Sequence, residues 1–198
     1  MRQTCETYGL LGKSVLMMEE KMKLYEGRPK DESGRAEKEI RVYDVLDRLK
    51  IPFLRVDHEV TPTIESCKGV DELLEIEICK NLFLCNAQKT KFYLLMLSGD
   101  KKFKTKDLSH QIGSARLSFA DAQHMEQYLG VTPGSVSVLG LINDTDHKVR
   151  LLIEKNVLES EMFGCHPCVN TTSLKMKMKD LLEKFLPYTG HEYTEVQL

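Results

Sequence analysis

The sequence lacks any run of about 18 consecutive apolar residues, the length at which a helix becomes a candidate for spanning a membrane. It also lacks the pattern of a secretory signal, because acidic residues follow the short apolar patch near the N-terminus and no small-residue cleavage site is present. No internal repeat is recognisable. We therefore expect neither a membrane-spanning protein nor a repeat array, and we expect a cytoplasmic location.

A strong excess of one charge is also missing, since 28 basic side chains face 30 acidic ones and the formal net charge is -2. A protein that binds nucleic acid indiscriminately gains its affinity by neutralising many phosphates. The charge balance argues against such a protein, and we expect no DNA partner, but a local basic patch can still hold one RNA end. The lysines that either form this patch or are simply solvated surface are Lys101, Lys102, Lys104 and Lys106, with Lys175, Lys177 and Lys179.

Two regions differ in their pattern: residues 1–34 are predicted to be an N-terminal extension and linker, and residues 35–198 to be one domain. The stretch 26–34 is polar, contains one proline and two glycines, and has no apolar period. The whole chain is 41% hydrophobic and 29% charged, which is ordinary for a globular domain.

From residue 35 onward, helix and strand patterns alternate. Ile40, Tyr43, Leu46 and Leu49 recur at three-residue steps and predict a helix that Pro52 ends. Further helices are expected at 63–74 with Thr63 as its cap, at 105–112, at 120–129 with Gly130 as its stop, and at 180–186 before Pro187. Strands are expected at 53–56, 76–84, 92–97, 149–153 and 173–176. This alternation predicts an α/β fold with a mixed (parallel and antiparallel) sheet and packed helices.

The motif Cys-x-x-Cys at Cys165 and Cys168 has three interpretations. A redox pair needs the first thiol at a helix N-terminus, whereas residues 169–174 favour a turn into a strand. A zinc site would have to add Cys79 and Cys85, whose spacing is unusual for a metal site. We favour the third interpretation, in which ordinary reduced thiols of a cytosolic protein flank a functional His166.

Three short segments carry side chains or backbone suited to a small polar ligand. His166 is followed by the stiff residue Pro167 and then by Asn170, and such rigid loop residues can donate and accept hydrogen bonds. Residues 130–140 contain glycines that allow successive backbone N–H groups to hold a carbonyl oxygen or phosphate. Composition alone favours a simpler interpretation of that loop, a helix stop before a buried strand.

The third segment is Lys80 and Asn81, a charged and an amide side chain in an otherwise apolar strand. The alternatives for Lys80 are a snorkelling or edge position and a ligand for a phosphate, for which a compact ammonium is suited. The order and spacing of all three segments resemble the YbaK/prolyl-tRNA synthetase editing-domain superfamily, over residues 36–198. Within it, the chain is most similar to the free-standing prolyl-tRNA deacylases. The matching residues are Lys80 and Asn81, residues 134–137 leading into 139–144, and His166, Pro167, Asn170 and Thr171.

The resemblance implies an enzyme, an aminoacyl-tRNA hydrolase that removes alanine from tRNA(Pro) in trans to the synthetase, with no cofactor and no metal. A positioned water, a ribose hydroxyl and N–H groups at the developing oxyanion would replace a side-chain nucleophile. The implied partners are the charged tRNA and, as a further candidate, prolyl-tRNA synthetase, with a monomer as the expected state. The implied catalytic residues are Lys80, at the phosphate of the terminal adenosine, and Gly134. The implied substrate-binding residues are Asn81, Ser135, Val136, Ser137, His166 and Asn170.

One position departs from the family pattern, because relatives place proline where this chain has Val138. Proline fixes φ, so the valine is expected to leave the loop at residues 134–138 with more freedom. This departure and the N-terminal segment motivate a second hypothesis, a module that binds aminoacyl-tRNA or a free amino acid without hydrolysis. A thiol redox protein is the third hypothesis.

Overall fold

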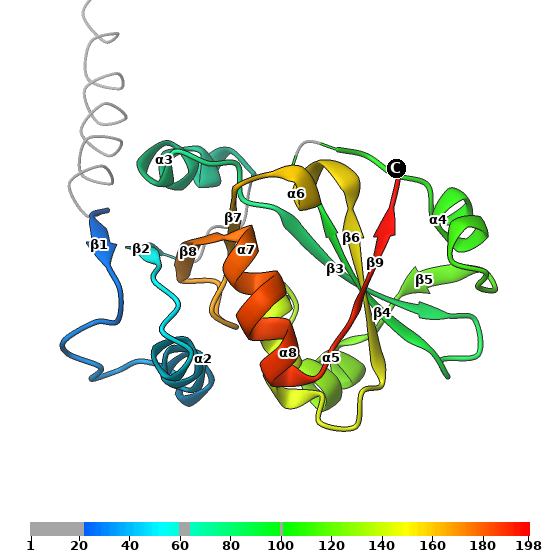
Figure 1. Ribbon diagram of the computed structural model, residues 1–198, viewed down its shortest axis with the longest axis horizontal. Helices are drawn as coiled ribbons and strands as arrows, with labels where there is room; N and C mark the ends of the chain where they lie inside the picture. The colour runs from blue at the N-terminus through cyan, green and yellow to red at the C-terminus, as the bar shows by residue number, and fades with distance from the viewer. Residues whose placement is uncertain (1–21, 60–63, 100) are drawn as a thin grey trace, which may run out of the picture.

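A computed structural model describes residues 22–59, 64–99 and 101–198, and Figure 1 shows two sheets side by side with helices packed around them. Helix α2 (Glu37–Arg48) forms where the apolar period predicts it, with Val42, Tyr43 and Leu46 fully buried. Acidic residues in its first turn and Arg48 in its last turn complement the helix dipole. The helix ends before Pro52, as predicted.

The larger sheet has five strands in the order β5-β3-β4-β6-β9. Strand β3 pairs antiparallel with both β4 and β5, whereas β4–β6 and β6–β9 are parallel. The prediction of a mixed sheet is therefore confirmed. The strands are β3 (Lys80–Asn86), β4 (Phe92–Leu97), β5 (Leu117–Phe119), β6 (Val149–Glu154) and β9 (Tyr193–Val196).

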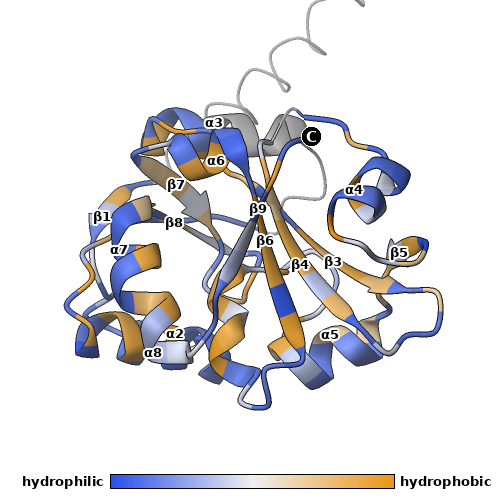
Figure 2. Ribbon diagram, turned by 45° about the vertical axis from the view of Figure 1, so that its right-hand side comes forward, coloured by the Kyte–Doolittle hydropathy of each residue, from blue (hydrophilic) through white to orange (hydrophobic). Residues whose placement is uncertain are grey.

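Strand β4 is buried on both faces, as its continuous apolar run predicts. Leu94 and Met96 belong to the main hydrophobic core, while Tyr93 and Leu95 belong to a second cluster on the opposite face of the sheet. The inner strands of this sheet are accordingly coloured mostly hydrophobic in Figure 2. Helix α4 (Thr105–Gln111) contributes Leu108 to the second cluster.

The smaller sheet is antiparallel, has four strands in the order β1-β2-β8-β7, and was not foreseen as a separate sheet. Its strands are β1 (Leu24–Glu26), β2 (Leu54–Asp57), β7 (Met162–Cys165) and β8 (Thr172–Lys177). The predicted strand at 76–84 is wrong at its start, because β3 begins at Lys80 and residues before it approach β7 instead. Ile78 forms a single parallel bridge with Gly164, where an added Cβ would lie 2.7 Å from Ile76 Cδ1. Only glycine allows the two sheets to approach so closely there.

Three of the remaining predicted helices are present, a short helix α6 (Lys155–Glu159) was not predicted, and the C-terminal helix differs from its prediction. Helix α5 (Ala122–Leu129) is ended by Gly130 at φ 63°, and α3 (Ile64–Leu74) lies where expected, although its predicted cap Thr63 is outside the described residues. The helix predicted to end before Pro187 continues through it: α7 (Met178–Asp180), a π-helical turn η2 (Leu181–Phe185) and α8 (Leu186–Thr189) follow one another. Proline is tolerated because it occupies the first turn of α8, where its missing N–H is not needed.

The segment predicted as extension and linker contains part of the smaller sheet. Strand β1 pairs with β2, and Gly27 N–H donates to Phe53 O at 2.8 Å. Arg28 reaches Asp44 of α2 at 2.7 Å. A three-residue edge strand is too short to produce a readable period, which is why β1 was not recognised within the predicted extension and linker at residues 1–34. Among the described residues, none of the helices combines the length and apolar character needed to cross a membrane.

Candidate active site

The loop after α5 is closed by hydrogen bonds between near neighbours. The Ser135 hydroxyl donates to Thr132 O at 2.9 Å and accepts from Thr132 N–H at 3.1 Å. The Ser137 hydroxyl accepts from Leu139 N–H at 3.2 Å and so caps the 3-10 helix η1 (Val138–Asn143). This replaces the buried strand that composition favoured after residue 130. Both serine hydroxyls are buried and occupied, so the backbone is what this loop offers to a ligand.

The backbone donors of the loop are not all used. Ser135 N–H donates to Thr132 O, whereas the N–H groups of Gly134 and Val136 have no acceptor in the described part of the chain. Gly134 has φ 87°, a conformation that favours glycine. Two free N–H groups on either side of a used one, in such a turn, can hold a carbonyl oxygen or an oxyanion.

Asn81 connects strand β3 to this loop. Its side-chain Oδ1 accepts from Val138 N–H at 3.0 Å, and its Nδ2 donates to Cys79 O at 3.3 Å. Val138 is fully buried. The N–H of Val138 makes an anchoring hydrogen bond that proline cannot make, which argues against the expectation of a freer loop.

The His166 segment lies against the same loop. An added Cβ on Gly134 would be 3.6 Å from Asn170 Nδ2, which places the two segments in contact. His166 follows β7, and its Nδ1 is 2.9 Å from Thr172 O and 3.4 Å from Ser173 Oγ. Burial lowers the pKa of His166, an effect that the Thr172 carbonyl opposes and the nearby His58 ring reinforces. His166 is therefore a neutral imidazole near pH 7.

Lys80 is a predicted site residue that does not lie where the Gly134 loop meets the His166 segment. Successive residues of a strand point to opposite faces, and Asn81 faces the loop while Lys80 shares the parity of Leu84, which packs in the second core cluster. Lys80 Nζ donates to Lys101 O at 3.4 Å, a long hydrogen bond that leaves the ammonium able to reorient.

The Cys-x-x-Cys thiols are buried and poorly suited to chemistry. Burial raises the pKa of Cys165 well above its usual range and raises that of Cys168 to about 12. Cys79 lies near Gly164, but Cys85 lies beside Ser118 of β5. Within the part of the chain that the structure describes, no group of three or more His, Cys, Asp or Glu residues is arranged to hold a metal ion. These observations argue against the redox and zinc interpretations.

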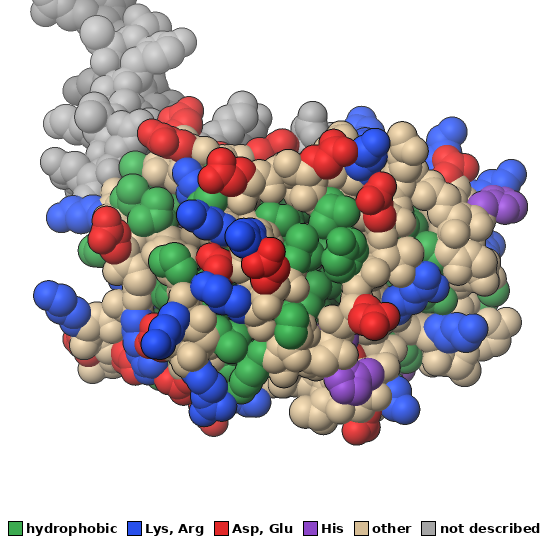
Figure 3. All heavy atoms as spheres, in the orientation of Figure 1, with side chains coloured by type: hydrophobic (Ala, Val, Ile, Leu, Met, Phe, Trp, Pro, Cys, Tyr) green, Lys and Arg blue, Asp and Glu red, His purple; other side chains and the backbone are tan. Residues whose placement is uncertain are grey.

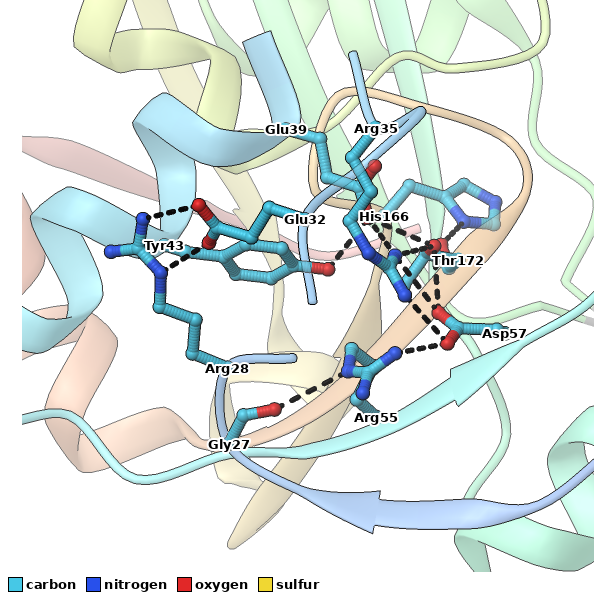
Figure 4. A network of polar contacts seen from close by, with 10 residues as sticks. All are labelled: Gly27, Arg28, Glu32, Arg35, Glu39, Tyr43, Arg55, Asp57, His166 and Thr172. Carbon is cyan, nitrogen blue, oxygen red and sulfur yellow. Dashed lines mark hydrogen bonds and ion pairs between the residues drawn. The ribbon is translucent and has the colours of Figure 1, made fainter. Parts of the chain in front are cut away.

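Sequence reasoning missed the polar residues that surround Thr172. Arg35, Glu39, Asp57 and Thr172 form a network of ion pairs and hydrogen bonds behind His166 (Figure 4). No periodic signal marked them, because they come from the segment before α2, from α2, from β2 and from β8. The pairing of β2 with β8 and the packing of α2 bring them together.

Basic and acidic side chains are interspersed on the face of the molecule shown in Figure 3. Lys175 Nζ donates to Leu74 O at 2.6 Å, and Lys179 pairs with Glu183 at 3.8 Å. The second lysine cluster is thus partly engaged within the protein.

Comparison with known proteins identifies the family of this fold and site. A model of the aminoacyl-tRNA editing domain matches residues 58–184, which is more than half of the chain. The chain belongs to the aminoacyl-tRNA editing-domain family. The superfamily and the enzyme class, an aminoacyl-tRNA hydrolase, are those that the sequence resemblance implied.

Relatives and solved structures agree with this family. The prolyl-tRNA editing protein ProX of Acetoanaerobium sticklandii is 33% identical over 153 residues, which cover 77% of this chain and 93% of that protein. Prolyl-tRNA synthetase associated domain-containing protein 1 of Mus musculus is 30% identical over 165 residues, covering 80% and 92%. A crystal structure described as a candidate trans-editing enzyme for prolyl tRNA synthetase superposes with a TM-score of 0.60 at 15% identity, covering 82% of this chain and 98% of that one. The superposition supports the predicted fold class.

Proposed function

We propose that this protein hydrolyses alanine from mischarged tRNA(Pro), acting in trans to the synthetase. The observation that carries the proposal is the contact between the Gly134 loop and Asn170, with Asn81 anchoring the loop to β3. This junction combines unpaired backbone donors with a neutral imidazole, and the family relation supplies the substrate class. The similarity to ProX and to the synthetase-associated proteins supports tRNA(Pro) as the RNA.

The proposed chemistry is addition of water to the ester carbonyl. The N–H groups of Gly134 and Val136 donate to the carbonyl oxygen as it becomes an oxyanion, which stabilises the transition state more than the ground state. The water oxygen bonds to the carbonyl carbon, the bond from that carbon to the ribose oxygen breaks, and a proton passes from the water to the ribose oxygen. A neighbouring ribose hydroxyl assists by positioning the water. Alanine and a tRNA with a free terminal hydroxyl are released.

The other residues bind and orient the substrate in this proposal. His166 lines the aminoacyl pocket and Asn170 braces its loop against Gly134. Lys80 leaves its long hydrogen bond with Lys101 O to reach the phosphate of the terminal adenosine. Discrimination against proline would rest on steric exclusion, because attractive contacts with an extra methylene are worth only about 1–3 kcal/mol.

A deacylation panel tests the function. Purified protein is incubated with tRNA(Pro) carrying alanine, serine, cysteine or proline, and the remaining charged tRNA is measured over time. We expect loss of alanyl-tRNA and survival of prolyl-tRNA. Persistence of alanyl-tRNA with folded protein would reject the proposal, and faster loss of the serine or cysteine ester would replace alanine as the substrate.

The hypothesis of a non-hydrolytic binding module makes a different prediction, retention of charged tRNA on a filter without its deacylation. Its structural motivation was a loosened loop at Val138. That motivation is weaker now, because Val138 N–H is anchored by Asn81. Filter binding measured beside the hydrolysis panel separates the two functions.

A further inference from the structure

The charged side chains of the network behind His166 are half-buried or buried. Glu39 is 3% exposed, and it pairs with Arg35 at 2.6 Å and accepts from Tyr43 OH at 2.7 Å. Asp57 pairs with Arg35 at 2.8 Å and also contacts Arg55. Buried ion pairs are weak contributors to stability, because desolvation of the charges offsets most of their attraction. A network of this kind therefore calls for a role beyond holding the sheet together.

The hydroxyl of Thr172 is the point where this network ends. Thr172 is 1% exposed, and its Oγ1 is 3.1 Å from Glu39 Oε1 and 3.2 Å from Asp57 Oδ1. Both carboxylates are acceptors, and Arg35 holds them on either side of the single hydroxyl donor, as Figure 4 shows. These contacts favour one rotamer of the Thr172 side chain, while the pairing of Thr172 with Asp57 in β2 holds its backbone.

The backbone oxygen of the same residue holds His166. A carbonyl oxygen only accepts, so the 2.9 Å contact between His166 Nδ1 and Thr172 O requires the proton to be on Nδ1. In a neutral ring, Nε2 then carries a lone pair and no proton. Within the described residues, Nε2 has no hydrogen-bond partner.

A second set of hydrogen bonds is compatible with the same assignment. His58 Nδ1 is 2.9 Å from Glu59 O and so carries a proton, and in the neutral form of that ring Nε2 is an acceptor. The Ser173 hydroxyl, 2.9 Å from His58 Nε2, must then donate to it. Its lone pairs are left facing His166 Nδ1–H at 3.4 Å. The contacts of His166 Nδ1 with Thr172 O and with Ser173 Oγ therefore both support the Nδ1–H tautomer.

We propose that Thr172, held between Glu39 and Asp57 by Arg35, is a positioning residue that fixes His166 as its Nδ1–H tautomer and directs Nε2 as an acceptor toward the site. The group that Nε2 accepts from is a hydrogen-bond donor at the aminoacyl-ribose end of the substrate, its ammonium or a ribose hydroxyl. Only this last clause rests on the proposed function. The assignment of tautomer and positioning role belongs to the free protein and can be measured without substrate.

The decisive experiment compares Thr172→Val with Thr172→Ser and with Tyr43→Phe. Valine keeps the shape of threonine and removes the hydroxyl, serine retains the hydroxyl, and Tyr43→Phe removes a different hydrogen bond to the same Glu39. Nitrogen-15 chemical shifts of the labelled histidines report the tautomer, thermal unfolding reports stability, and steady-state deacylation reports kcat and KM.

We expect the Nδ1–H form of His166 to dominate in the wild type, in Thr172→Ser and in Tyr43→Phe, and to be mixed with the other tautomer in Thr172→Val. Deacylation by Thr172→Val should fall about 10- to 100-fold in kcat/KM, the range seen when an orienting partner of a functional histidine is lost. Thr172→Ser should remain within about threefold of the wild type. Tyr43→Phe should lower the unfolding temperature without changing the tautomer or kcat.

An unchanged tautomer in folded Thr172→Val overturns the inference, whatever its activity, and so does a loss of activity in Tyr43→Phe as large as that in Thr172→Val. If Thr172→Val does not fold, Arg35→Lys provides the same test, because lysine cannot bridge both carboxylates as the guanidinium does. A mixture of the two His166 tautomers in the wild-type protein also overturns the inference. Failure of the wild type to hydrolyse any charged tRNA would reject the proposed function, while the nitrogen-15 measurement would still decide the role of Thr172.

Discussion

The two loops that meet at Gly134 and Asn170 are stabilised in opposite ways. The Gly134 loop is closed locally, by hydrogen bonds between Ser135 and Thr132, three residues apart. The His166 loop is held by partners far away in sequence, since Thr172 contacts Glu39 across 133 positions and Asp57 across 115. The comparison shows that the Gly134 loop is a local backbone turn, whereas the geometry of the His166 loop depends on the assembly of the smaller sheet.

The largest effect on deacylation is expected from a substitution in the Gly134 loop. Gly134→Ala places a Cβ at φ 87° and 3.6 Å from Asn170 Nδ2, so the turn must shift and its free N–H groups move with it. Loss of an oxyanion donor typically lowers kcat about 10²- to 10³-fold, and we expect a decrease of about 100-fold in the deacylation assay.

Gly113→Ala is the matched control for that variant. Gly113 has φ 64° and no atom within 4 Å of an added Cβ, so it carries the same backbone strain away from the site. We expect a similar loss of stability and unchanged turnover. Equal turnover by both variants would show that the Gly134 backbone takes no part in catalysis.

Lys80 tests whether a third segment, outside both loops, belongs to the site. Lys80→Ala removes the proposed phosphate contact, and a hydrogen bond to a charged group is worth about 1.5–3 kcal/mol. We expect a decrease of about 10- to 100-fold in kcat/KM. The exposed Lys148→Ala, outside the candidate RNA-binding lysines, is the control for a general change of charge, and wild-type turnover by Lys80→Ala would remove Lys80 from the site.

The anchor between β3 and the Gly134 loop should show as a coupling between Asn81 and Val138. Asn81→Ala leaves the buried Val138 N–H without its acceptor, which should lower the free energy of unfolding by about 1–3 kcal/mol. In a Val138→Pro background no N–H remains, so Asn81→Ala should be less damaging there. Denaturant unfolding of the four proteins of this cycle measures the difference. Additive losses would show that the hydrogen bond contributes nothing.

The smallest effect is expected in the pH dependence of deacylation, through His166 in the loop held by Glu39 and Asp57. Burial lowers the pKa of His166 below its ordinary value of 6.5, with the Thr172 carbonyl opposing this shift and His58 reinforcing it. The neutral acceptor should therefore lose its lone pair to a proton at a lower pH than an ordinary histidine with a pKa of about 6.5. Activity should fall only as pH passes through the lowered pKa.

The same shift has a consequence for stability. The unfolded chain binds a proton at His166 near pH 6.5 while the native protein does not, so this residue makes unfolding easier as pH decreases from about 6.5 to its native pKa. A pH–rate profile together with proton NMR titration of His166 measures both quantities. An inflection in activity at or above pH 6.5 that follows His166 would contradict this account.

Much of the fold was predictable because its signals are local. The period of Ile40, Tyr43 and Leu46 marked α2, the continuous apolar run at 92–97 marked a central strand, and Gly130 marked the end of α5. Short edge strands such as β1 were missed because three residues carry no readable period. The end of the last helix was mistaken because a proline at the start of a helical turn is tolerated, whereas one inside it is not.

The sequence by itself determined the segments that carry the chemistry, because each is a contiguous set of residue types: Lys80 with Asn81, the Gly134 loop, and His166 with Asn170. Only the tertiary structure decided how they meet. It placed Asn81 and Lys80 on opposite faces of β3, anchored Val138, and joined Gly134 to Asn170. It also brought Glu39 and Asp57 to Thr172 behind His166. Such contacts depend on sheet pairing and helix packing between residues from about twenty to more than a hundred positions apart, and no local pattern in a single sequence encodes them.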